Sequence, residues 1–260
     1  MEFIELDTVA STSSHLAAMT DTAPHGTVVM AREQTAGRGQ RGNSWEAEPG
    51  ANITLSLLLR PAGLHPSRQF IISQAVSLAI VEMLDAFVGE PRVSIKWPND
   101  IYVGDRKICG ILIENSITGS GINHCIVGIG LNVNQMQFVS DAPNPVSLRQ
   151  LMPKIEFDVA ALARAMVEDI IARVDEALSC ESATPVEEES AISREYFARL
   201  WRNDGWYPYH DNVRDVDMTA RIDAVAPTGH ITLTDRADSM ARTYAFKEIS
   251  AILEENDCRV

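Results

Sequence analysis

Residues 33–60 read EQTAGRGQRGNSWEAEPGANITLSLLLR, a glycine-rich loop followed by a strand pattern. The glycines at 37, 39 and 42 match the spacing G-x-G-x-x-G, which opens a helix in a dinucleotide-binding fold. In this chain the loop leads instead to Pro49 and Gly50, and then to apolar residues at every second position from 53 to 59. A period of two predicts a half-buried strand. The sequence therefore argues against a dinucleotide-binding βαβ unit.

The loop itself suits an anionic ligand. Its glycines let the backbone come close to a ligand, and its N–H groups can form an anion-binding concavity. The guanidinium groups of Arg38 and Arg41 can each form paired hydrogen bonds with a carboxylate or phosphate. The alternative is a flexible surface loop with ordinary arginines, and the segment alone leaves both interpretations open.

Helix and strand patterns alternate on both sides of this loop, and from about residue 205 the sequence shows only short strand patterns. Strands are predicted at residues 27–32, 52–60, 93–97, 101–103, 107–115 and 124–133, and helices at residues 11–20, 66–88 and from 158 onward. An acidic stretch at 181–189 is predicted to link to a last helix ending near residue 201. Short strands then follow at residues 219–225, 230–234 and 241–249, which predicts a small closed barrel.

Composition and charge narrow the possible partners. With 22 Lys and Arg against 36 Asp and Glu, the formal net charge of -14 repels nucleic acid and anionic lipid. The first residues, MEFIELDTVA, lack the basic region of a signal peptide, and no apolar run is long enough to span a membrane. We expect a cytoplasmic protein with no nucleic-acid or membrane partner. The cysteines at 109, 125, 180 and 258 form no C-x-x-C pair, so neither a zinc site nor a disulfide framework is expected.

Three further stretches carry polar groups or bare backbone suited to a ligand. Residues 96–100 read KWPND, a strand running into a turn with a cation, an amide and a carboxylate, although a plain hairpin is equally consistent with it. Residues 107–114 read KICGILIE, where a glycine inside an apolar strand permits close approach. Residues 128–132 read GIGLN, a strand end whose amide could read a base edge. The P-loop, nucleophile-elbow and H-E-x-x-H patterns are missing from the sequence.

Taken in order, five stretches resemble the biotin–protein ligases, also called biotin–[acetyl-CoA-carboxylase] ligases. They are STS at 11–13, EQTAGRG at 33–39, KWPND at 96–100, Lys107 with GILIE at 110–114, and GIGLNVN at 128–134. The resemblance implies an α+β fold, a mixed and mainly antiparallel sheet with flanking helices like that of class II synthetases. It also implies a small C-terminal SH3-like β-barrel, with domains at residues 1–203 and 204–260. The chain starts directly at the catalytic part, which resembles the monofunctional type without a DNA-binding domain.

The resemblance further implies a reaction, its cofactors and its partner. Biotin and MgATP would give biotinyl-5′-AMP, and biotin would then pass to one lysine of a biotin carboxyl carrier domain in a biotin-dependent carboxylase. Because a carboxylate attacks a phosphate, the site needs cations to stabilise the transition state. The sequence leaves the acceptor carboxylase and the oligomeric state open, with a homodimer as one alternative.

By the same resemblance, individual residues receive expected roles. Lys107 and Arg38 would be the catalytic cations. The biotin-binding residues would be Ser11, Thr12, Ser13, Gln34, Gly37, Arg38 and Gly110. The nucleotide-binding residues would be Arg41, Trp45, Lys96, Asn99, Asp100, Lys107, Gly128 and Asn132. Many relatives carry a basic residue where this chain has Gln40, and the sequence leaves open whether Arg41 supplies that contact. It also leaves open whether Asp100 orients the site or binds a metal.

Two alternatives compete with this interpretation. The first is a lipoate–protein ligase or octanoyltransferase of the same fold class, against which the arginine-containing glycine loop and KWPND argue. The second is a biotin-binding module without chemistry, for which loss of Lys107 or Arg38 would be expected. Both residues are present, so an enzyme is favoured.

Overall fold

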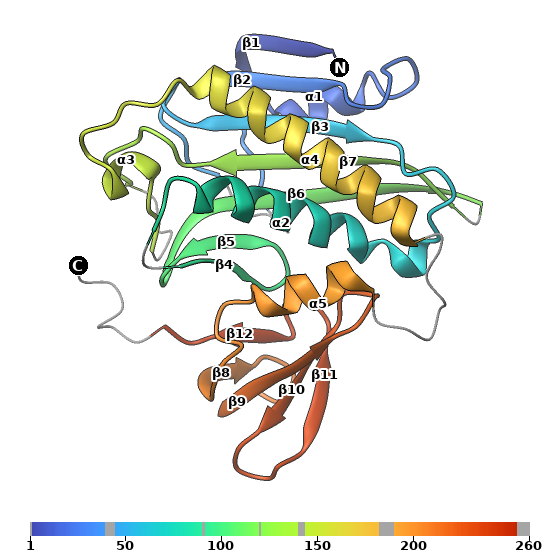
Figure 1. Ribbon diagram of the computed structural model, residues 1–260, viewed down its shortest axis with the longest axis vertical. Helices are drawn as coiled ribbons and strands as arrows, with labels where there is room; N and C mark the ends of the chain where they lie inside the picture. The colour runs from blue at the N-terminus through green and yellow to red at the C-terminus, as the bar shows by residue number, and fades with distance from the viewer. Residues whose placement is uncertain are drawn as a thin grey trace.

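The computed structural model describes residues 2–39, 45–89, 92–119, 121–139, 144–181 and 190–253. Two sheets are built from them (Figure 1). The larger has seven strands in the order β1-β2-β3-β7-β6-β5-β4. Its strands are β1 (Phe3–Val9), β2 (Val28–Gln34), β3 (Ile53–Leu59), β4 (Val93–Lys96), β5 (Asp100–Val103), β6 (Arg106–Thr118) and β7 (Gly121–Leu131). Only β1 and β2 pair in parallel among these strands, which confirms the predicted mixed and mainly antiparallel sheet.

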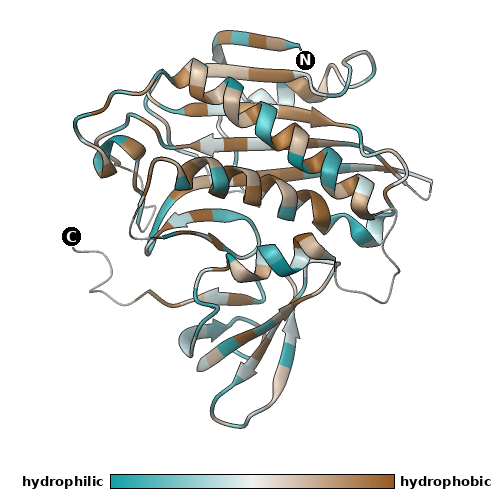
Figure 2. Ribbon diagram, in the orientation of Figure 1, coloured by the Kyte–Doolittle hydropathy of each residue, from teal (hydrophilic) through white to brown (hydrophobic). Residues whose placement is uncertain are grey.

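Helices cover both faces of this sheet. The helices of the described segments are α1 (Thr12–Ala17), the 3-10 turn η2 (Pro66–Arg68), α2 (Phe70–Asp85), α3 (Leu148–Leu151), α4 (Val159–Glu181) and α5 (Ala191–Ala198). The long helices α2 and α4 pack on one face, and the short α1 lies on the other (Figure 1). Figure 2 shows hydrophobic residues gathered in the inner strands and along α2, while hydrophilic residues recur along α4. The start of α4 agrees with the sequence, because the Asp158 carboxylate accepts hydrogen bonds from the N–H groups of Ala160 and Ala161, both at 3.0 Å.

Strand β3 is buried on both faces, which corrects the prediction of a half-buried strand. All seven of its residues are buried. Leu55 and Leu57 pack toward α2 and α4, whereas Leu58 packs with Leu16 of α1. The alternating polar positions lie on a buried face and not on a solvent face, because α1 covers them. Ser56, for example, is 0% exposed.

The hydroxyl groups near the start of α1 contact the sheet and do not cap the helix. Ser11 occupies the N-cap position but makes no side-chain cap hydrogen bond. The Thr12 and Ser13 hydroxyls instead form hydrogen bonds with the Ser56 hydroxyl at 2.8 Å and 2.9 Å. They therefore fasten α1 onto the sheet instead of capping it.

The C-terminal part forms a second, five-stranded antiparallel sheet in the order β11-β10-β9-β8-β12. Its strands are β8 (Tyr207–Asp211), β9 (Val216–Val225), β10 (Ile231–Asp235), β11 (Ala241–Tyr244) and β12 (Ile249–Ala251). This agrees with the predicted small C-terminal β domain. The sequence analysis missed β1 and β8, and it merged β11 and β12 into one strand. The boundary at residues 203 and 204 stays a prediction, and the acidic stretch at 182–189 lies outside the described residues.

The second sheet is attached to the β4–β5 end of the first. The Trp97 indole N–H donates a hydrogen bond of 2.9 Å to the Gly229 carbonyl. The Trp97 and Phe246 rings lie 5.9 Å apart between centroids. Phe70 packs so closely on Gly229 that an added methyl group would lie 2.8 Å from its ring. Loops of the second sheet therefore lie next to the space beside β4 and β5. None of the helices in the described segments combines the length and apolar character needed to span a bilayer.

Candidate active site

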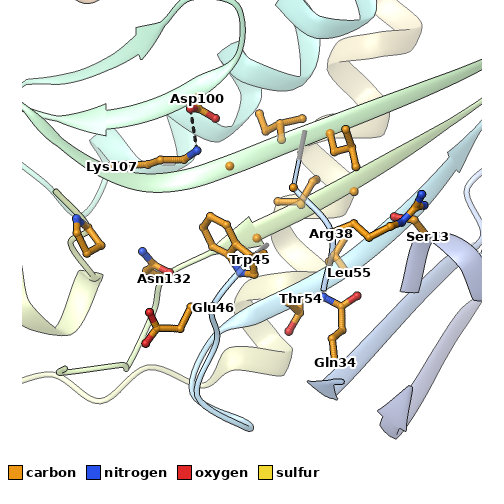
Figure 3. Close-up of a pocket in the computed structure, with 18 of the residues that line it drawn as sticks. Ser13, Gln34, Arg38, Trp45, Glu46, Thr54, Leu55, Asp100, Lys107 and Asn132 are labelled. Atoms are coloured by element: carbon orange, nitrogen blue, oxygen red, sulfur yellow. Dashed lines mark ion pairs between the residues drawn. The ribbon is translucent and has the colours of Figure 1, made fainter. Parts of the chain in front are cut away.

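A cavity of about 770 Å³ crosses the larger sheet on the face that carries α1. It runs from the end of β2 to the β4–β5 hairpin, and the second sheet closes its far wall. Twelve of the predicted site residues line it: Ser11, Thr12, Ser13, Gln34, Arg38, Trp45, Lys96, Asp100, Lys107, Gly110, Gly128 and Asn132. Figure 3 shows Gln34, Ser13 and Arg38 on one side, Lys107, Asp100 and Asn132 on the other, and Trp45 between them.

Three predicted residues are placed differently. Gly37 adjoins the cavity, because a methyl group on it would lie 3.3 Å from the Gln34 amide nitrogen. Asn99 lines a smaller neighbouring cavity of about 220 Å³ between the two sheets. Arg41, together with Gln40, lies outside the described residues.

The β2 end of the cavity is built from neutral hydrogen-bonding groups. The Gln34 amide oxygen accepts hydrogen bonds from the Thr12 backbone N–H at 2.8 Å and the Thr12 hydroxyl at 3.1 Å. These contacts use the oxygen and leave the amide N–H₂ as the donor. On β7, a methyl group on Gly128 would lie 3.1 Å from the Ser13 hydroxyl oxygen, so the glycine leaves room beside that hydroxyl. This end suits an uncharged polar group.

Arg38 pairs with a carboxylate that the sequence analysis did not assign. Its guanidinium donates two hydrogen bonds to the Glu114 carboxylate, at 2.9 Å and 3.3 Å. Both side chains are a little under half exposed, so the ion pair is screened by water and contributes little stability. Glu114 holds the guanidinium beside the cavity.

The opposite end carries two lysines held in different ways. The Lys107 ammonium lies 2.7 Å from the Asp100 carboxylate. Its backbone is fixed on both sides, because its N–H donates to the Asn144 carbonyl at 2.8 Å and its carbonyl accepts from the Val146 N–H at 2.9 Å. The Lys96 ammonium donates to the Tyr102 hydroxyl at 3.1 Å. This end therefore presents fixed cations to the cavity.

Burial changes the ionisation of the side chains under this end. It lowers the pKa of Lys96, an effect that the nearby Asp100 carboxylate opposes. Burial also raises the pKa of Tyr102 to about 12, so its hydroxyl stays protonated. The pKa of the buried Cys109 thiol is likewise raised by burial, which keeps a thiolate out of the site.

Trp45 lies flat on a patch of bare backbone in the middle of the cavity. Gly110 and Gly130 are cross-strand partners on β6 and β7. A methyl group on Gly130 would lie 2.3 Å from the Trp45 ring, and one on Gly110 would lie 2.9 Å from it. Two facing glycines are therefore required for the indole to reach the sheet. The room that the sequence analysis reserved for ligand at Gly110 is occupied in part by this ring.

Two buried polar atoms of the cavity lack a hydrogen-bond partner within the described chain. They are the Trp45 indole nitrogen, a donor, and the Asn132 side-chain oxygen, an acceptor. The Asn132 amide nitrogen is already used, because it donates to the Val146 carbonyl at 3.0 Å. Buried polar groups without partners are costly in a finished structure. A ligand that both accepts and donates hydrogen bonds would satisfy the pair.

Sequence reasoning missed several groups that line the cavity. They are Glu46, Thr54, Tyr102, Asn144, Phe246 and Lys247. The alternation in β3, which predicted a half-buried strand, could have indicated Thr54. No sequence pattern pointed to Phe246 or Lys247, which the second sheet contributes.

The cavity offers little for a metal ion bound by protein alone. In the described part of the chain, no three His, Cys, Asp or Glu side chains cluster closely enough to hold one. Mg²⁺ in enzymes commonly binds through one or two carboxylates together with substrate phosphates. Asp100 is the carboxylate at the cationic end among the described lining residues, so the site fits a Mg²⁺ ion that arrives with phosphate ligands.

The glycine patch gives a direct test of the Trp45 position. Replacing Gly130 with alanine is expected to push the indole off the sheet, because the new methyl group would lie 2.3 Å from the ring. We expect a loss of about 1–3 kcal/mol in the free energy of unfolding, typical of overpacking. Urea unfolding and acrylamide quenching of tryptophan fluorescence would measure both effects. Gly89→Ala is the matched control, because a methyl group there meets no atom within 4 Å. Equal quenching in both variants would contradict the placement of Trp45.

Comparisons with known proteins find relatives for about half of the chain. Residues 7–132 match the model of the biotin/lipoate A/B protein ligase family. The bifunctional ligase/repressor BirA of Bacillus spizizenii is 42% identical over 114 residues, which cover 44% of this chain and 34% of that protein. The biotin–[acetyl-CoA-carboxylase] ligase of Paracoccus denitrificans is 42% identical over 107 residues, which cover 40% of this chain and 43% of that protein. The chain thus matches less than half the length of these two relatives.

The fold resembles that of a solved structure over nearly the whole chain. The biotin protein ligase from Aquifex aeolicus, solved in complex with biotin and ATP, superposes with a TM-score of 0.75 at 21% identity. The match covers 96% of this chain and 97% of that one. The predicted fold class and the resemblance drawn from the motifs are confirmed. Over residues 7–132, just under half of its length, the chain is similar to the biotin/lipoate A/B protein ligase family.

Proposed function

We propose that this protein uses ATP to activate biotin as biotinyl-5′-AMP and then transfers biotin to a lysine of a biotin carboxyl carrier domain. One observation carries the proposal: a single cavity joins a neutral hydrogen-bonding end to a cationic end across a bare glycine patch. Biotin has an uncharged ureido ring at one end and a carboxylate at the other, and it matches that polarity. The relatives named as biotin ligases support the same substrate.

The neutral end would hold the ureido ring. Gln34, Thr12 and Ser13 supply neutral donors and acceptors there, already ordered by their hydrogen bonds to one another and to Ser56. Such preorganisation lowers the entropic cost of binding. The valeryl chain would then run over the sheet toward Lys107, passing Gly110.

In the first step a biotin carboxylate oxygen attacks the α-phosphorus of ATP. A new P–O bond forms, the bond between the α-phosphorus and the oxygen bridging to the β-phosphate breaks, and pyrophosphate leaves. The two reacting groups are both anionic, so Lys107 would hold them together and stabilise the charge that builds up, and Arg38 would approach them from the Gln34 side of the cavity. Their present partners, Asp100 and Glu114, keep both cations in place before substrates arrive.

The nucleotide would lie between Trp45 and the cationic end. The unpaired Asn132 oxygen can accept a hydrogen bond from an adenine amino group, and the Trp45 ring offers a face for stacking. Magnesium would enter as MgATP, with Asp100 as its protein carboxylate. Lys96 and Arg41 keep their proposed places at the nucleotide, whereas Gly128, beside Ser13, would lie at the end that holds the ureido ring.

In the second step the neutral amine of the acceptor lysine attacks the acyl carbon of the adenylate. The C–N bond forms, AMP leaves, and the amine loses a proton. We place this reaction in the cytoplasm, on the carrier domain of a biotin-dependent carboxylase. A homodimer and the lack of a nucleic-acid partner stay predictions from the sequence.

The test is biotin-dependent release of pyrophosphate from ATP. We expect the purified protein to release pyrophosphate only when biotin is present, and to label an added carrier domain with biotin. Lipoate and octanoate are the matched controls, because the same family includes ligases for lipoate. Release that depends on lipoate or octanoate, but not on biotin, would replace this proposal with the alternative substrate.

A further inference from the structure

The second sheet contributes a cation to the cavity through the turn at residues 245–248. This turn joins β11 to β12, and both Phe246 and Lys247 line the cavity. The remaining described lining residues come from the larger sheet, α1 and their loops. Lys247 is therefore the one described basic side chain of the cavity that a separate sheet brings to it.

The backbone at Lys247 is held in a conformation that favours glycine. Its φ is +70°, in the left-handed region that residues with a Cβ rarely adopt. Hydrogen bonds on both sides maintain it. The Asn212 side-chain amide donates to the Lys247 carbonyl at 2.8 Å, and the Asn212 N–H donates to the Glu248 carbonyl at 2.9 Å. Non-glycine residues held in this region cluster at functional sites.

The charge of Lys247 is also unbalanced. Each other described cation of the cavity already has a partner: Arg38 has Glu114, Lys107 has Asp100, and Lys96 has the Tyr102 hydroxyl. No described residue forms an ion pair or a hydrogen bond with the ammonium group of Lys247, whose recorded contact is through its backbone carbonyl. A cation on a cavity wall with no counter-charge is suited to an anionic ligand.

The position of the turn shows which part of a ligand it would meet. Phe246 packs on Trp97, which follows Lys96 at the end of β4. The turn therefore borders the cationic end, beyond Asp100 and Lys107, and lies across the sheet from Gln34. A ligand that reacts beside Lys107 would have its outer portion next to Lys247.

We propose that Lys247 binds the β- and γ-phosphates of ATP, the portion that leaves as pyrophosphate. The inference rests on the proposed function, which places the biotin carboxylate and the α-phosphate beside Lys107. An ammonium on the far wall can then contact the oxygens of the leaving group without competing for the reacting carboxylate. The role makes the second sheet a part of the nucleotide site.

The left-handed backbone allows a test that separates charge from folding. Lys247→Gly removes the cation and also relieves the backbone, so the melting temperature is expected to be no lower than that of the natural protein. We expect the KM for ATP to rise about tenfold, equivalent to about 1.4 kcal/mol. The KM for biotin is expected to stay within twofold of the natural value. The inhibition constant of added pyrophosphate is expected to rise by about the same factor as the KM for ATP. Lys247→Arg keeps the charge and is expected to restore most of the affinity for ATP.

Ser239→Gly is the matched control. Ser239 also has a left-handed backbone, with φ +57°, but it does not line the cavity. We expect this variant to keep the natural KM for both substrates. The inference would be overturned if the KM of Lys247→Gly for ATP stayed within twofold of the natural value. It would also be overturned if the KM for ATP rose equally in Ser239→Gly, or if the KM of Lys247→Gly for biotin rose as much as its KM for ATP.

A binding measurement keeps this inference separate from the proposed function. If the natural protein released no pyrophosphate with biotin, the proposed function would fail by itself. Calorimetric titration with inorganic pyrophosphate would still compare the natural protein with Lys247→Gly. Weaker binding by the variant supports the anion contact, and equal binding refutes it.

Discussion

Replacement of Lys107 by alanine is expected to slow adenylate formation at least about a hundredfold, which corresponds to about 2.7 kcal/mol of transition-state stabilisation. The ammonium is held 2.7 Å from Asp100, and its backbone is fixed by residues 144 and 146. Its removal would take away a preorganised cation and would also leave the Asp100 carboxylate unpaired among approaching anions. Single-turnover formation of the adenylate, followed by pyrophosphate release, would measure the loss.

Two further measurements make the result specific to chemistry. Biotin should still bind to Lys107→Ala, because the neutral groups around Gln34 and Thr12 do not depend on this lysine. Lys154→Ala is the matched control, since it removes one exposed lysine outside the cavity and is expected to leave the rate unchanged. Near-normal turnover in a folded Lys107→Ala protein would remove this residue from the mechanism.

Replacement of Asp211 by alanine is expected to destabilise the second sheet by about 2–4 kcal/mol. The side chain of Asp211 is 1% exposed and accepts hydrogen bonds from four donors. They are the backbone N–H groups of Val213 and Arg214, the Arg214 guanidinium at 2.6 Å and the Tyr244 hydroxyl at 2.7 Å. Truncation would leave these donors without an acceptor. Urea unfolding would measure the change.

The same carboxylate makes stability depend on pH. Burial raises the pKa of Asp211, but the hydrogen bonds from Arg214, Tyr244 and Val213 outweigh burial and lower it to about 2. Because an unfolded aspartate titrates near 3.9, the stabilisation is fully present above that pH and is lost as the pH falls toward about 2. Asp211→Asn should abolish this part of the acid sensitivity.

An exposed carboxylate in the same sheet provides the control for this prediction. Asp217 pairs with His210 at 2.7 Å, but its side chain is 76% exposed. Asp217→Ala is expected to change the free energy of unfolding by no more than about 1 kcal/mol. A loss in Asp211→Ala no larger than that in the control would contradict the assigned network.

Local patterns were sufficient for much of the fold. The alternation in residues 53–59 and the apolar run in 107–115 predicted strands that the structure contains as β3 and β6. Strand β1 escaped because its acidic residues obscured its apolar ones, and β8 escaped because Pro208 and polar residues interrupt it. A local sequence pattern indicates whether a short segment favours a helix or a strand. It does not report which neighbours will cover that segment.

The sequence by itself indicated the resemblance to biotin ligases and a set of candidate site residues, because five short ordered stretches carry both. Only the tertiary structure decided how these residues are partnered. It paired Arg38 with Glu114, 76 positions away. It laid Trp45 on two facing glycines, and it brought Lys247 from the second sheet to the wall of the cavity. Such contacts depend on strand order and on the packing of one sheet against another, and no local period in the sequence encodes either.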